Sequence, residues 1–185
     1  MTQRWTMFLS IWPLAATLAG CDGTGPGLLG GASALGDAVE DALPVDQARV
    51  CRIPDDADQI ADQIIRLINM ERFELGSVQS DPALTQVAGD YACQMIQDDF
   101  FAHEHPVTGA DVSARLSNAG YVFTVTGENL AAGYWSPTEI TDGWISSSAH
   151  RQVLLDTDFS RAGIAVRYGG AHGVYCVLIL ADRPE

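Results

Sequence analysis

The sequence predicts an α+β domain in which helices come first and a strand pair closes the chain. Residues 57–68 repeat apolar side chains three and four positions apart, which indicates a helix that ends before Gly76. Two apolar runs, 162–167 and 174–180, flank the turn sequence YGGAHG and predict a hairpin, and residues 121–126 predict a further strand. Because helices and strands do not alternate, this order favours α+β over a doubly wound parallel sheet.

Three further helices are predicted from their start signals. Asp81 precedes a proline and caps a helix with one apolar side. Asp111 begins a short helix that ends at Gly120. The sequence SPTE, residues 136–139, is a capping box that opens a helix running through Trp144. Trp144 has apolar helical neighbours, so we expect it to pack against the sheet.

Composition excludes several classes of protein. The chain has 185 residues, enough for one domain with attachments, and its apolar fraction of 47% excludes a disordered acidic protein. The formal charge is −14 and all ten basic residues are arginines. This balance, without a basic run, argues against nucleic-acid binding and against broad docking onto anionic lipids. We expect a monomer.

The N-terminus has the pattern of an export signal. Arg4 precedes an apolar stretch of signal-peptide length, too short to span a bilayer comfortably. The following LAGC resembles a bacterial lipobox, which predicts a signal peptide at residues 1–20 and a lipid on Cys21; the alternative is an ordinary secretory signal with a chance cysteine. Residues 21–50 then form the lipidated, glycine-rich tether of residues 51–185. We expect anchoring to the bacterial envelope, with inner or outer membrane left open.

Export implies an oxidising compartment for the remaining cysteines. Once Cys21 carries lipid, three cysteines allow one disulfide and one leftover thiol. Cys176 lies in the apolar run VYCVLIL, where a lone cysteine behaves as a small hydrophobe. We therefore favour a disulfide between Cys51 and Cys93, which would link the start of the first helix to the second.

Five segments together resemble the CAP superfamily of cysteine-rich secretory proteins, antigen 5 and plant pathogenesis-related proteins, and its bacterial branch in particular. They are LINMERFELG, DPALTQVAGDYACQMIQDDFFAH, GENLAAG, WISSSAHRQVLL and DFSRAGIAV, in this order across residues 57–181. The resemblance implies a three-layer α-β-α sandwich around a small antiparallel sheet. It also implies a cleft where histidines and acids from separate segments converge.

Carried over by position, the resemblance places His103, Glu128 and His150 in that cleft. Animal and plant members have a second glutamate where this chain has Ser147, so the four-residue His/Glu site is incomplete. Two imidazoles and a carboxylate are a competent ligand set for zinc or another divalent cation. The alternative is a hydrogen-bonded cluster that ties loops together without metal.

The other polar residues of these motifs receive structural roles. We expect His105 to be exposed and His172, in a glycine-flanked turn, to be solvated. Asn129 is expected to hydrogen-bond nearby backbone. The serines 146–148 suit helix termination, although Ser147 would share a helical face with His150 if the helix continued. A serine hydrolase is not favoured, because the sequence has no Gly-x-Ser-x-Gly elbow.

Three functions follow from these observations. The first is a lipid-anchored binding module whose cleft takes a divalent cation and a small or lipid-like ligand. The second is a metal-assisted hydrolase of envelope peptides or glycans, with Glu128 as general base. The third is a structural or adhesive envelope protein. A binding module requires only the ligand residues that the sequence offers, whereas an enzyme also requires a catalytic arrangement. We therefore favour a binding module over an enzyme.

Overall fold

The computed structural model describes residues 49–182. The predicted signal peptide (1–20), the lipid site Cys21, the tether up to residue 48 and residues 183–185 lie outside the described residues. No helix within 49–182 is long and apolar enough to cross a membrane.

A four-stranded sheet forms the middle of the domain. Its strands are β1 (Gln79–Ser80), β2 (Thr126–Ala132), β3 (Arg161–Tyr168) and β4 (Val174–Ala181), in the order β1-β3-β4-β2. β4 pairs antiparallel with both neighbours, while the short β1 pairs parallel with β3. We expected a wholly antiparallel sheet, but the parallel pair of β1 and β3 makes the sheet mixed. β2 lies at one edge, and this edge carries the candidate site.

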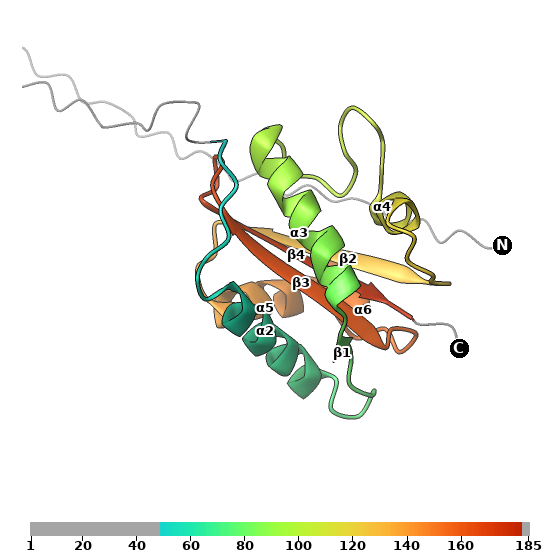
Figure 1. Ribbon diagram of the computed structural model, residues 1–185. Helices are drawn as coiled ribbons and strands as arrows, with labels where there is room; N and C mark the ends of the chain where they lie inside the picture. The colour runs from blue at the N-terminus through green and yellow to red at the C-terminus, as the bar shows by residue number, and fades with distance from the viewer. Residues whose placement is uncertain (1–48, 183–185) are drawn as a thin grey trace, which may run out of the picture. The chain divides into compact units, whose positions relative to one another are not determined.

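Helices cover both faces of the sheet, as Figure 1 shows. α3 (Pro82–Gln97) and α4 (Val112–Asn118) pack on one face, and α2 (Ala57–Glu71), α5 (Pro137–Ser146) and α6 (Ser148–Leu154) pack on the other. Alternate residues of β4 point to opposite cores: Cys176 and Leu178 to the α2 side, Val177 and Ile179 to the α3 side. This is the expected α-β-α sandwich.

The helix starts follow the predicted capping chemistry. The Asp81 side chain accepts a hydrogen bond from the Ala83 backbone N–H at the start of α3. Ser136 and Glu139 form both hydrogen bonds of the capping box at the start of α5. Trp144, in the same helix, is buried and donates from its ring N–H to the Leu130 carbonyl at 2.9 Å. α5 is thereby tied to the edge strand β2.

The disulfide joins Cys51 to Cys93, as favoured from the sequence. It links the chain before α2 to the middle of α3. Cys176 is a free, fully buried thiol in β4, and burial raises its pKa to about 12. The thiol therefore acts as a small core side chain.

Two parts of the element prediction are wrong. Residues 121–125 are not a strand, because the Asp182 carboxylate accepts the backbone N–H groups of Thr124 and Val125. β2 instead begins at Thr126 and includes Gly127, Glu128 and Asn129, residue types that are uncommon in strands. The sequence analysis also missed α6, which starts directly after the break at Ser147.

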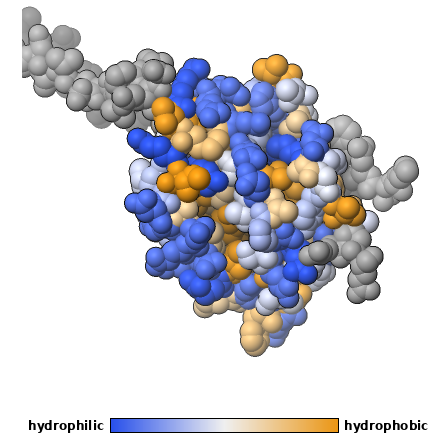
Figure 2. All heavy atoms as spheres, viewed as in Figure 1, coloured by the Kyte–Doolittle hydropathy of each residue, from blue (hydrophilic) through white to orange (hydrophobic). Residues whose placement is uncertain are grey.

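The surface combines polar and apolar residues. On the face shown in Figure 2, apolar side chains form separate patches among polar ones. Among the described residues, Phe73 and Val107 are the most exposed large apolar side chains, each at 86%. Neither lies in the candidate site.

Candidate functional site

His103 and Glu128 meet at the α3 side of the edge strand. The Nδ1 atom of His103 lies 2.9 Å from Oε1 of Glu128, whose side chain is 2% exposed. An ionised carboxylate only accepts hydrogen bonds, so Nδ1 is the donor, and in the neutral form of the ring the lone pair is on Nε2. The His103 side chain is 37% exposed, so this arrangement presents an oriented imidazole at the surface.

Arg115 of α4 completes this cluster, and the sequence analysis did not identify it. Its Nη2 atom forms a short ion pair with Oε2 of Glu128, and its Nη1 atom donates to the carbonyls of His103 and Ala110, each at 3.0 Å. The guanidinium also lies over the Tyr91 ring, 3.3 Å from its centroid. The positive charge therefore stabilises the buried carboxylate and holds the His103 backbone.

Tyr91 supports the same loop from α3. It is 1% exposed, and its hydroxyl donates to the Ala102 carbonyl at 2.6 Å. Burial raises the pKa of Tyr91 to about 12, so the hydroxyl stays protonated and remains a donor at neutral pH. Tyr91 thus holds the carbonyl of Ala102 and Arg115 holds the carbonyl of His103. These two hydrogen bonds fix the loop between α3 and α4 at His103.

His150 approaches from α6, on the other side of β2. Burial lowers the pKa of His150, and the neighbouring His103 lowers it further. The imidazole is therefore neutral at pH 7. Asn129 holds the start of α6 in place, because its amide donates to the His150 carbonyl at 3.1 Å, a backbone contact as expected.

Ser147 does not share a helical face with His150. Its backbone has φ −92° and ψ 120°, so the chain turns between α5 and α6 instead of continuing as one helix. Ser146 and Ser147 thus end α5 as predicted, whereas Ser148 begins α6, and the spacing argument for a serine nucleophile beside His150 fails. Ser147 lies at the turn that positions α6.

His105 differs from its predicted environment, whereas His172 is exposed as expected. The His105 side chain is 14% exposed rather than solvent-facing: Nδ1 accepts backbone N–H groups from Val107 and Thr108, and Nε2 lies 3.4 Å from Asp98. This imidazole closes its own loop. His172 is exposed, but it also packs edge-on against Phe101 and Tyr175, with ring centroids 5.7 and 5.4 Å away.

Both oxygens of Glu128 are engaged, one by His103 and one by Arg115. Each contact uses one lone pair of its oxygen, so a further role for Glu128 as a general base or metal ligand would depend on the remaining lone pairs of a side chain that is 2% exposed. Within residues 49–182, no three His, Cys, Asp or Glu side chains are grouped to hold a metal ion. A cation held here would depend on the His103 and His150 imidazoles, with Glu128 behind His103 as its orienting partner.

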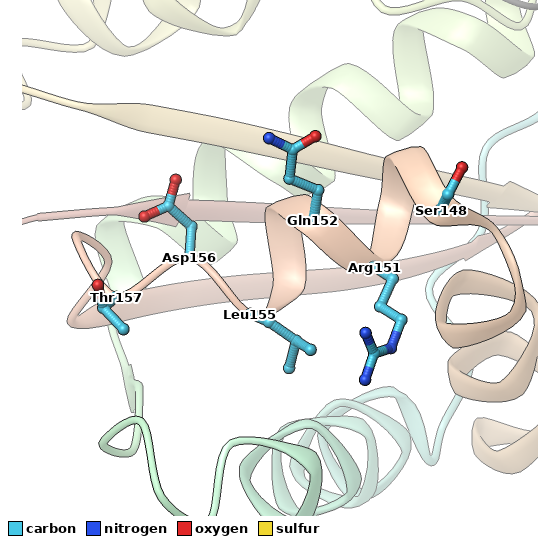
Figure 3. Close-up of a pocket in the computed structure, with 6 residues that line it drawn as sticks. All are labelled: Ser148, Arg151, Gln152, Leu155, Asp156 and Thr157. Atoms are coloured by element: carbon cyan, nitrogen blue, oxygen red, sulfur yellow. The ribbon is translucent and has the colours of Figure 1, made fainter.

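A cavity of about 270 Å³ lies beside His150. It is lined by residues from the β2 edge, α5, α6 and three loops: Phe101, Leu130, Ala131, Ala132, Tyr134, Ile140, Gly143, Trp144, His150 and His172. A second hollow lies over α6, where Figure 3 shows Ser148 and Gln152 projecting to the opposite side from Arg151 and Leu155. Its side chains diverge and include no histidine.

The three-layer sandwich is the architecture of the SCP, or cysteine-rich secretory, type of domain. Residues 66–180, more than half of the chain, match the CAP family, described as the cysteine-rich secretory protein family. The chain belongs to this family.

Two relatives come from Bacillus subtilis. YkwD is 27% identical over 111 residues, which are 59% of this chain and 43% of YkwD. The membrane protein YlbC is 29% identical over 106 residues, 56% of this chain and 30% of YlbC. Both are described as uncharacterized, and the chain spans less than half the length of each.

Solved structures agree with the fold. An outer surface protein of Borrelia burgdorferi superposes with a TM-score of 0.65 at 20% identity, over 73% of this chain and all of that one. An extracellular SCP-domain protein of Bacillus anthracis has a TM-score of 0.59 at 26% identity, over 69% of this chain and 41% of that one. The fold is thus shared with surface and extracellular proteins of bacteria.

Proposed function

We propose that the chain is an exported binding protein, anchored to the bacterial envelope by lipid at Cys21, whose cleft binds a divalent cation through His103 and His150. The observation that carries the cation site is the chain of contacts from Arg115 to Glu128 to His103. A carboxylate that accepts from one ring nitrogen sets the tautomer and raises the basicity of the other nitrogen. Imidazole ligands suit zinc and its neighbours among the transition metals.

His150 supplies the second donor. A metal ligand must be deprotonated, and burial already keeps this imidazole neutral at pH 7. The ion would supply a positive centre that polarises a bound ligand. Two imidazoles leave the other positions to water or ligand, which favours exchangeable rather than structural binding. We propose that the domain acts as a monomer and that a small ligand completes the site.

Zinc titration of the full chain by calorimetry tests the cation site. We expect one ion at about micromolar affinity in the wild type and no binding in His103→Ala/His150→Ala. His105→Asn is the matched control, since it removes a neighbouring imidazole that only closes its loop, and it should bind as the wild type does. Equal binding by the double variant, or none by the wild type, would overturn the proposal.

Glu128→Gln separates the two roles of this side chain. If Glu128 orients His103, the amide keeps a hydrogen-bonding partner and weakens zinc binding about 10–100-fold. If Glu128 is itself a ligand, binding is abolished as in the double histidine variant. The same titration distinguishes these outcomes, with thermal unfolding as a check that the variant is folded.

The anchor is tested separately. In a bacterium with lipoprotein export, we expect the wild-type chain in the membrane fraction and Cys21→Ser in the soluble exported fraction. Mass spectrometry of the N-terminal peptide should show acyl chains on Cys21. A wild-type protein that is cleaved but not acylated would support the ordinary secretory signal instead.

A further inference from the structure

The cavity beside His150 has partly exposed aromatic walls that the surrounding core holds in place. Phe101 is 42% exposed and Tyr134 is 46% exposed. Phe101 packs edge-on against Tyr175, with ring centroids 6.1 Å apart, and Tyr175 is 1% exposed. Because His172 contacts both of these rings, Phe101 is positioned before any ligand arrives.

Gly143 keeps one wall of the cavity open. It lies inside α5, where glycine lowers helix stability relative to alanine. Its φ is not positive, and an added Cβ would meet only the Tyr134 ring, at 3.9 and 4.0 Å. Neither the backbone nor the packing requires glycine here. The missing side chain therefore leaves space that a ligand can use.

The lining determines the kind of ligand. It contains no Asp, Glu, Lys or Arg, so no side chain with a permanent charge lines it. Its polar groups are the His150 and His172 imidazoles and the Tyr134 hydroxyl, beside apolar walls from Leu130 and Ile140. An alkyl chain would leave these polar groups without partners. An uncharged ligand with one apolar face and a hydrogen-bonding edge fits both parts.

We propose that this cavity binds a pyranose ring of an uncharged glycan, including N-acetylated sugars, with the C–H face of the ring against Phe101 and Tyr134. The sugar hydroxyls point to His150 and His172, which can donate and accept hydrogen bonds. The cavity shares His150 with the proposed cation site, but its aromatic walls and its open side at Gly143 are separate features. Sugar binding therefore does not require the cation.

The test is calorimetric titration of the full chain with N-acetylglucosamine and glucose oligosaccharides, in a detergent without sugar headgroups. Each titration is run once with chelator and once with zinc. We expect saturable binding with chelator present. No saturable binding of either oligosaccharide would overturn the proposal, whatever the zinc titration shows. Sugar binding without zinc binding would overturn only the cation site.

Gly143→Leu and Phe101→Ala locate the ligand. Gly143→Leu fills the cavity and should weaken sugar binding at least about tenfold. Phe73→Ala is the control, because it removes an exposed phenyl ring outside the cavity, and it should bind sugar as the wild type does. Phe101→Ala should weaken binding while zinc binding stays unchanged. If Gly143→Leu, folded by its melting curve, binds sugar as the wild type does, the cavity is not the site.

Discussion

Two arginines, Arg72 wholly buried and Arg115 with 9% of its side chain exposed, hold two regions of this domain together in different ways. Arg72, at the end of α2, is 1% exposed and donates to the carbonyls of Gly76, Leu154, Asp156 and Phe159. All of these partners are backbone atoms. Arg115 donates to two carbonyls as well, but it also pairs with the buried carboxylate of Glu128.

Arg72 therefore forms a structural joint, that is, a contact that only connects backbone segments, whereas Arg115 belongs to the candidate site. The Arg72 guanidinium donates hydrogen bonds to carbonyls of the turn after α2 and of the connection from α6 to β3. These contacts hold the backbone together and orient no side chain of the candidate site. Around Arg115 the charge passes through Glu128 to a side chain that reaches the surface, His103. A buried ion pair is weak evidence of stability by itself, and here it also orients a functional group.

The largest effect is expected for Arg72→Met. The substitution leaves several buried carbonyls without donors, which should lower the free energy of unfolding by about 3–5 kcal/mol. Zinc affinity in the folded fraction should not change. Chemical denaturation and calorimetry below the melting temperature measure the two quantities. A change in zinc affinity would contradict the purely structural role of Arg72.

Arg115→Met should cost about 3 kcal/mol, because it leaves the Glu128 charge buried without compensation. Adding Glu128→Gln removes that charge, so the double variant should recover part of the loss. The coupling energy between positions 115 and 128 should be on the order of 1–3 kcal/mol. In the control cycle, Arg72→Met and Glu128→Gln should add within about 0.5 kcal/mol. Denaturation of all five variants supplies the values.

A pH effect should be confined to the site. The folded-state pKa of His150 is lowered from 6.5, first by burial and then by His103. The unfolded chain therefore binds more protons as the pH falls below 6.5, and the stability that the neutral imidazole contributes is lost from there downward. His150→Gln should show a shallower loss of unfolding free energy between pH 7 and pH 5 than the wild type. Equal slopes would contradict this.

The smallest effect is expected at Gly143. Gly143→Ala should raise the free energy of unfolding by about 0.5–1 kcal/mol, because a helical glycine is replaced where space is available. Gly163→Ala is the matched comparison in β3. There an added Cβ would overlap the backbone of Leu84 and Thr85, so the variant should be destabilised. Thermal melts of both variants test the contrast.

Local signals predicted most of the fold. The caps at Asp81 and Ser136 act through side chains two or three residues from their partners, so their hydrogen bonds can be anticipated from spacing. The 162–167 and 174–180 runs form β3 and β4 because long apolar stretches have few alternatives to a central sheet. The strand expected at 121–126 failed because Asp182, distant in sequence, takes its backbone N–H groups.

The site was only partly predictable. His103, Glu128 and His150 were identified, and the first two are in contact. Arg115 was missed because an arginine on a short exposed-looking helix carries no pattern that marks it as buried. His105 was expected to be exposed, yet the hydrogen bonds that hold it come from its own loop's fold. The spacing of residues in the sequence predicts neither the burial of the Arg115 side chain nor that of His105.

The sequence by itself predicted the α+β class and the starts of α3, α4 and α5, and it favoured the Cys51–Cys93 pairing. These depend on periodicity, caps and the counting of thiols, all of which act locally or by exclusion, whereas the positions of His103, Glu128 and His150 followed from the resemblance to the CAP superfamily. Only the tertiary structure decided that Glu128 is engaged by Arg115 and that Gly143 opens onto aromatic walls. Both depend on how separate helices pack against the edge of one sheet. Burial there makes the Glu128 charge require a partner, and packing decides whether the missing side chain of Gly143 leaves open space.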